Sequence, residues 1–65
     1  MMIQLQNGNW VASQHIEELW AEAKDAYVGM VSTLTYTEHY DTHEQAVARR
    51  DELARIVHEA ERKQP

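Results

Sequence analysis

Residues 37–45, TEHYDTHEQ, contain two histidines and three carboxylates, side chains that can bind a metal ion or transfer protons. His39, Asp41 and His43 are the ligand types that zinc takes in proteins. However, histidines four residues apart share a face only when both lie on one helix, and small cytosolic zinc sites usually recruit cysteine, which this chain lacks. We therefore expect neither a metal ion nor a cofactor here.

The same segment also has the pattern of a junction between a strand and a helix. Thr42 stands three residues before Gln45, which is the spacing of a capping box. Acidic side chains around a helix N-terminus are stabilised by the helix dipole. This interpretation explains the segment without any chemical activity, and it predicts that a helix begins after Thr42.

Catalysis by the rest of the chain is disfavoured by its composition and size. The 65 residues include no cysteine, so neither a cysteine nucleophile nor a thiolate ligand is available. Ser13 and Ser32 belong to no motif that joins a nucleophile to a base and an orienting acid. A chain of this length buries only about 60% of its unfolded surface, which leaves little room for an enclosed pocket. We predict that the protein is not an enzyme.

The first twelve residues have the pattern of a hairpin. Apolar and polar residues alternate over 2–6, and Asn7-Gly8 is the preferred pair for a two-residue type I′ turn. A two-residue loop would pair Leu5 with Trp10 on one face of the hairpin. The following segment changes period, because Ile16, Leu19, Trp20, Ala23 and Tyr27 recur at helical spacing.

We interpret residues 14–25 as a short helix with Ser13 as its N-cap, while a strand over 13–20 remains the alternative. Residues 27–40 are rich in β-branched and aromatic side chains and predict two strands separated by a turn near 32–34. A long helix over 43–63 follows, and the centre of its apolar stripe is Ala46, Leu53, Val57 and Ala60.

These elements predict one α+β domain over residues 1–65. A small antiparallel sheet of three to four strands would pack against the long C-terminal helix and the shorter first helix. Most of the aromatic rings should lie in the core, because the chain has no phenylalanine, with one or two left exposed at a binding surface. We also expect neither a signal peptide nor a membrane span, because the opening residues lack a basic start and no stretch of the sequence approaches the ~20 apolar residues of a span.

Charge is the strongest indication of function. The formal net charge is -5, and residues 1–48 hold seven acids against one base, Lys24. Such a surface argues against direct binding of nucleic acid and favours a protein partner with a basic groove. The acids that we expect to contact this partner are Glu17, Glu18, Glu22, Asp25, Glu38, Asp41 and Glu44.

A short, acidic, cysteine-free α+β domain without catalytic machinery resembles the small anti-CRISPR proteins of phages. The resemblance implies a non-enzymatic inhibitor that mimics DNA and blocks target DNA binding by the type I surveillance complex Cascade. We expect the protein to act in the cytoplasm of the host bacterial cell and to be a monomer rather than a dimer. The alternative is a small structural or assembly module. Such a module would dimerise through an edge strand or through a stripe formed by Leu53, Ile56 and Val57.

Overall fold

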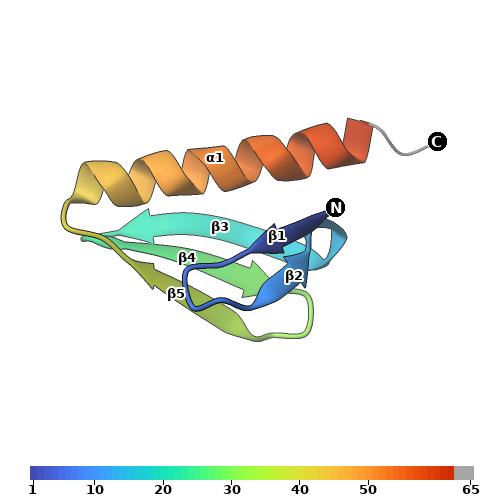
Figure 1. The fold of residues 1–65 in the computed structure, drawn as a ribbon, viewed down its shortest axis with the longest axis horizontal. Coiled ribbons are helices and arrows are strands. Elements are labelled where there is room, and N and C mark those ends of the chain that lie inside the picture. The colour runs from blue at the N-terminus through green and yellow to red at the C-terminus, as the bar shows by residue number, and fades with distance from the viewer. Residues whose placement is uncertain (63–65) are drawn as a thin grey trace.

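The computed structural model describes residues 1–62. Figure 1 shows the elements in chain order: β1 (Met2–Gln4), β2 (Trp10–Ala12), a single 3-10 turn η1 (Ser13–His15), β3 (Ile16–Glu22), β4 (Asp25–Met30), β5 (Thr35–His39) and α1 (His43–Arg62). Strands β1 and β2 form a hairpin, and β3, β4 and β5 form a three-stranded antiparallel sheet in that order. The predicted α+β class is confirmed, but the strands form two antiparallel sheets, of two and three strands, instead of the single predicted sheet.

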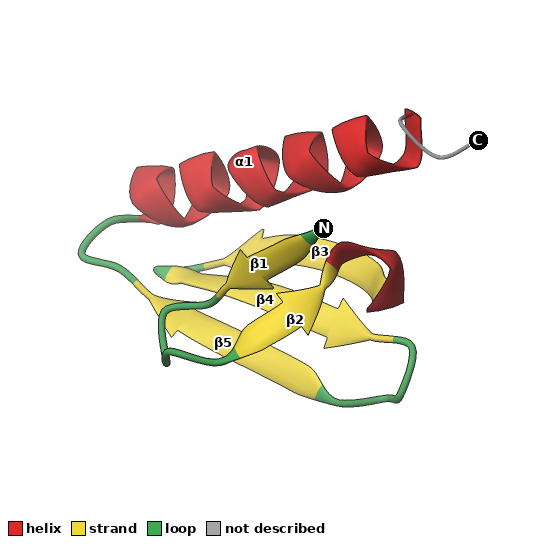
Figure 2. Ribbon diagram, turned by 45° about the vertical axis from the view of Figure 1, so that its right-hand side comes forward, coloured by secondary structure: helices red, strands yellow, loops and turns green. Residues whose placement is uncertain are grey.

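Helix α1 lies along one side of the three-stranded sheet, and the hairpin lies beside it (Figures 1 and 2). The buried core joins these layers through Ile3, Leu5, Val11, Val28 and Leu53. One face of the sheet, the inner face, therefore packs against the helix and the hairpin. No helix in residues 1–62 is both long enough and apolar enough to span a membrane.

The β1–β2 hairpin forms as predicted, but its register differs by one residue. The backbone N–H of Gly8 donates to the carbonyl of Leu5 at 2.9 Å, and the N–H of Leu5 donates to the carbonyl of Asn9 at 2.8 Å. The loop thus has three residues, with Gly8 at φ +91°, as in a type I turn followed by a bulge. As a result Trp10 pairs with Gln4 and is 59% exposed.

The predicted helix over 14–25 is wrong, because most of this segment is strand β3. A bulge lies between Ile16 and Glu18 in the pairing with β4. The extra residue, Glu17, brings Ile16 and Leu19 onto the same face although they are three residues apart, and both pack against the core. The spacing that suggested a helix therefore comes from an irregular strand.

Local helix propensity is also overridden in this segment. The run EELWAEAKDA contains good helix formers, yet its residues 18–22 pair with β4, residues 23–24 form the turn, and its last two residues begin β4. Ser13, the predicted N-cap, begins the short turn η1 and is buried. Ala23, the first loop residue of the β3–β4 hairpin, has φ +52°, a conformation unusual for alanine.

The predicted division of residues 27–40 into two strands is confirmed. The N–H of Thr33 donates to the carbonyl of Met30 at 2.9 Å, and the N–H of Met30 donates to the carbonyl of Leu34 at 2.8 Å. This is the same three-residue loop as in the first hairpin. Here the left-handed position is held by Thr33 at φ +74° instead of by glycine.

Helix α1 begins with the predicted capping box. The N–H of Gln45 donates to the Thr42 hydroxyl at 3.1 Å, and the N–H of Thr42 donates to the Gln45 side-chain carbonyl at 3.2 Å. Its inward stripe includes the buried Ala46, Leu53 and Ala60. The last residue of the predicted helix, Lys63, lies outside the described residues.

Candidate protein-binding face

The opposite face of the three-stranded sheet, here called the outer face, is not covered by any element within residues 1–62. Strand pairing arranges its side chains in three cross-strand rows. From one end of the sheet to the other these rows are Glu18–Gly29–Thr35, Trp20–Tyr27–Thr37 and Glu22–Asp25–His39. The middle row is aromatic, and a carboxylate lies in the row on each side of it.

The centre of the outer face is a stacked pair of rings. The ring centroids of Trp20 and Tyr27 are 5.1 Å apart, and the ring planes differ by 9°. Both side chains are only half-buried. Burial, the negative charge of Asp25 and its hydrogen bond with the Tyr27 hydroxyl all raise the pKa of Tyr27 above its ordinary value of 10.0.

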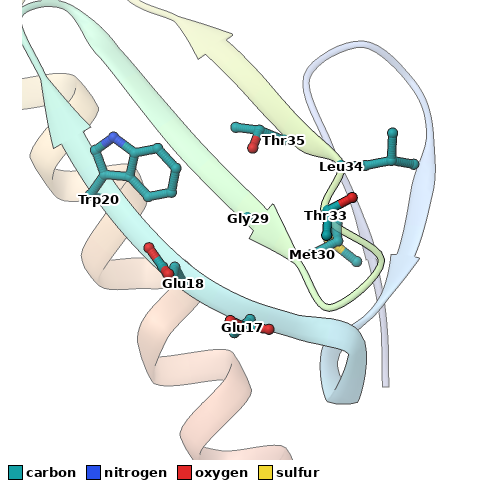
Figure 3. Close-up of a pocket in the computed structure, with 8 residues that line it drawn as sticks. All are labelled: Glu17, Glu18, Trp20, Gly29, Met30, Thr33, Leu34 and Thr35. Atoms are coloured by element: carbon teal, nitrogen blue, oxygen red, sulfur yellow. The ribbon is translucent and has the colours of Figure 1, made fainter.

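A hollow of about 240 Å³ opens beside Trp20 (Figure 3). Its floor is Gly29, where an added Cβ would lie 3.3 Å from Trp20 Cζ3. Glu17 and Glu18 line the hollow from β3, and Met30 and residues 33–35 line it from the β4–β5 turn. A volume below the roughly 300 Å³ at which small-molecule pockets begin suits one side chain of a partner better than a free substrate.

Four of the seven predicted acids lie on or beside the outer face. Glu18, Glu22 and Asp25 belong to its rows, and Glu17 is the bulged residue next to Glu18. Asp25 also accepts a hydrogen bond from Nδ1 of the exposed His39 at 2.7 Å. The structure therefore brings together the acids that come from the segment 17–25.

The other three acids are placed elsewhere. Asp41 and Glu44 are exposed around the start of α1, in the helical layer. Glu38 is 1% exposed and points to the inner side of β5. Its carboxylate is surrounded by other groups of the same chain, so it cannot contact a partner unless the core opens.

Glu38 is the centre of a buried hydrogen-bond network. One carboxylate oxygen accepts from the Tyr40 hydroxyl at 2.7 Å and from Arg49 Nε at 2.9 Å, and the other accepts from the backbone N–H of Gln6 at 2.7 Å. Burial opposes ionisation of Glu38, but the hydrogen bonds from Arg49, Tyr40 and Gln6 outweigh it and lower its pKa. The network joins the first hairpin, β5 and α1.

The pKa values of Tyr40 and Arg49, the side-chain partners of Glu38, are raised. Burial and the hydrogen bond to Glu38 raise the pKa of Tyr40 to about 12. Burial disfavours the charged form of Arg49, but its bonds to Glu38 and Glu52 outweigh this effect and raise its pKa. Arg49 also donates to the carbonyl of Gln4 at 3.1 Å. All these contacts are internal, so the group stabilises the fold.

The two histidines of residues 37–45 have separate partners. His39 contacts Asp25, and Nδ1 of His43 lies 2.5 Å from the carbonyl oxygen of Ala23. Within residues 1–62 no three histidine or acidic side chains gather in a way that could hold a metal ion. The histidine of the helix start instead ties α1 to the β3–β4 turn.

A second hollow, of about 250 Å³, lies between β3 and α1. Ile16, Leu19 and Val57 supply its apolar lining, and Glu17 and Glu18 also reach it. These two acids thus lie between two hollows. Strand β3 is an edge strand of the sheet, so its side away from β4 has no strand neighbour within residues 1–62.

Comparisons with protein-family models, with characterised proteins and with solved structures find no match to this chain. Sequence reasoning missed the Trp20–Tyr27 stack, which depends on the pairing of β3 with β4, and the Arg49–Glu38 pair, which depends on the packing of α1 against β5. The alternation of Glu18, Trp20 and Glu22 was the available signal, because these residues share one side of a strand.

Proposed function

We propose that this protein is a non-enzymatic binding protein that docks its acidic outer face on a basic surface of a protein partner. The observation that carries the proposal is the register of β3 and β4. It places Glu18, Glu22 and Asp25 around the Trp20–Tyr27 stack on a face that no other element of residues 1–62 covers. Aromatic anchors provide contact area, and the carboxylates provide steering and specificity.

The more specific form of the proposal is an inhibitor that imitates DNA, most directly an anti-CRISPR protein that blocks target DNA binding by the type I complex Cascade in the cytoplasm of a host bacterium. Two features support it: the net charge of -5, and the separation of Glu18 from Glu22 along β3. Four strand residues span roughly 13 Å, close to the ~12 Å width of the DNA major groove between its phosphate rows.

Two double charge-reversal variants test both the general and the more specific form of the proposal. In E18K/E22K two acids of the outer face become basic, whereas D51K/E59K makes the same charge change on exposed positions of α1, in the layer on the other side of the sheet. The assay is gel-shift titration of duplex DNA binding by purified type I Cascade complexes over a range of salt concentrations. The wild type and D51K/E59K should inhibit DNA binding, less so as salt rises, and E18K/E22K should not.

The outcomes separate the two forms. Failure of the wild type to inhibit any complex would remove the Cascade proposal. For any partner then captured from lysate, equal loss of binding by both double variants would remove the assignment to the outer face, because it would indicate dependence on total charge alone. Circular dichroism of each variant confirms that the fold is retained.

The alternative is an assembly module that dimerises. The apolar stripe expected to form the dimer contact is covered within the chain itself, since Leu53 is fully buried and Ile56 and Val57 pack on the core. Its edge-strand form retains one favourable observation, the seven-residue edge strand β3. Sedimentation equilibrium distinguishes the two proposals: a tight dimer would support the assembly module, and a monomer would support the binding protein.

A further inference from the structure

We infer that the hollow above Gly29 receives one arginine side chain of the partner, with its guanidinium group against the Trp20 ring and paired with the Glu18 carboxylate. The inference rests on the proposed function and makes it specific. It concerns the kind of residue that the outer face recognises, rather than its total charge.

The Trp20 indole offers an aromatic surface to the hollow. Trp20 stacks with Tyr27, and it also lines the hollow, where its indole lies next to Gly29 (Figure 3). The absence of a Cβ at Gly29 lets the indole lie close to the β4 backbone, since a Cβ there would lie only 3.3 Å from Trp20 Cζ3. An uncovered aromatic surface beside an open space attracts cations, and the planar guanidinium group does so most often.

Charge provides the second part. Glu17 and Glu18 both line the hollow, and neither is bonded to a basic side chain within residues 1–62. By contrast, the buried Glu38 already has Arg49 as its partner. A carboxylate next to an aromatic surface matches arginine better than lysine, because a guanidinium can stack on the ring and donate two parallel hydrogen bonds to the carboxylate.

The available space provides the third part. A hollow of about 240 Å³ that is open to solvent admits the end of a side chain, and Met30 and Leu34 at its other end offer apolar contact for the methylene groups. Leu34 is 59% exposed and Val31 in the same turn is 54% exposed, so apolar surface adjoins this end of the hollow. The pocket thus presents an apolar end and a charged end, as an arginine does.

The experiment uses N-acetyl-arginine methylamide as the probe, with the lysine and citrulline analogues as controls, in two-dimensional NMR titrations of the full chain. Citrulline has nearly the shape of arginine but no charge. The arginine probe should shift the Trp20 indole and Gly29 amide resonances in a saturable way. Binding of both control probes should be weaker by about tenfold or more, because citrulline lacks the charge and lysine cannot stack on the ring and donate two parallel hydrogen bonds to the carboxylate.

Two substitutions on the same face of β3 form the matched test. E18Q removes the carboxylate that lines the hollow, and E22Q removes one in the row beyond the aromatic pair. E18Q should weaken arginine binding about tenfold, and E22Q should leave it within about twofold. Equal effects of the two variants, or equal binding of arginine and lysine, would overturn the arginine pocket.

The probe titrations and the DNA-binding assay can fail separately, so the arginine pocket and the proposed function are tested apart. A chain whose E18K/E22K variant loses its partner, but whose hollow does not distinguish arginine from lysine, would keep its acidic binding face and lose only the specific pocket. A chain that binds the arginine probe but inhibits no complex would keep the pocket and lose the inhibitor function.

Discussion

Replacing Arg49 by methionine should destabilise the protein severely, although Arg49 lies on the helix that faces away from the candidate binding surface. Its side chain is 20% exposed, and the Glu38 side chain that it contacts is 2% exposed. Methionine retains much of the length and apolar packing of arginine but cannot donate a hydrogen bond. The substitution would therefore leave a buried carboxylate without its counter-charge.

The size of the effect follows from what remains around Glu38. Breaking a buried ion pair costs about 3–5 kcal/mol when one charge is left uncompensated. Tyr40 and the Gln6 N–H still donate to the carboxylate at 2.7 Å each, which places the expected loss near the lower limit, about 3 kcal/mol. The whole domain should be stable by about 3–10 kcal/mol, so this loss removes a large part of the total.

The neighbouring arginine provides the control. Arg50 bonds to Asp51 on the surface, with side chains 37% and 62% exposed. R50M should therefore cost less than about 1 kcal/mol. Urea denaturation followed by circular dichroism at 222 nm gives the free energy of unfolding of both variants at one pH. A loss for R49M no larger than that for R50M would refute the reasoning.

A double-mutant cycle tests the cause. E38Q removes the charge of Glu38 but retains a similar shape, so R49M should cost less in the E38Q background than in the wild type. Equal costs in both backgrounds would show that the packing of Arg49, rather than the charge of Glu38, supplies its contribution.

Three further predictions follow from the turns, the network and the helix start. T33G should raise the free energy of unfolding by about 0.5–1 kcal/mol, because relief of φ +74° outweighs the added backbone entropy; a loss of stability in urea would contradict it. Since folding lowers the pKa of Glu38, its contribution is present above the ordinary value of 4.5 and is lost as pH falls through the lowered value. When pH is lowered from 5 to about 2, the melting temperature should thus fall less steeply for E38Q than for wild type. T42A should cost about 1 kcal/mol by removing one half of the capping box, and an unchanged melting temperature would contradict this role.

The parts of the fold that sequence predicts well are those fixed by local chemistry. The Thr42–Gln45 capping box depends on residues three apart, and the hairpin at Asn7-Gly8 depends on a turn that glycine favours. Both are confirmed. The predicted hairpin register was wrong because a three-residue loop with a bulge is also compatible with Asn-Gly. The three-residue loop places Val11 rather than Trp10 in the core.

The candidate site was less predictable because it depends on pairing between distant residues. Net charge located the acids in the first part of the chain, but it could not separate the exposed Glu18 from the buried Glu38. The distinction depends on which side of its strand each residue occupies. It also depends on Arg49, eleven residues further along the chain, which reaches Glu38 only after β5 and α1 have packed.

The bulge at Glu17 both misled the sequence interpretation and shapes the proposed function. It imitates helical spacing, and it also places Glu17 and Glu18 together on the open side of β3, between two hollows. Antiparallel pairing of two copies through β3 would bring these acids of both chains into one sheet, where like charges oppose association. The same strand edge is attractive to a basic partner. Charge on this edge therefore selects between the two proposals: it disfavours self-assembly and favours binding of a cationic surface.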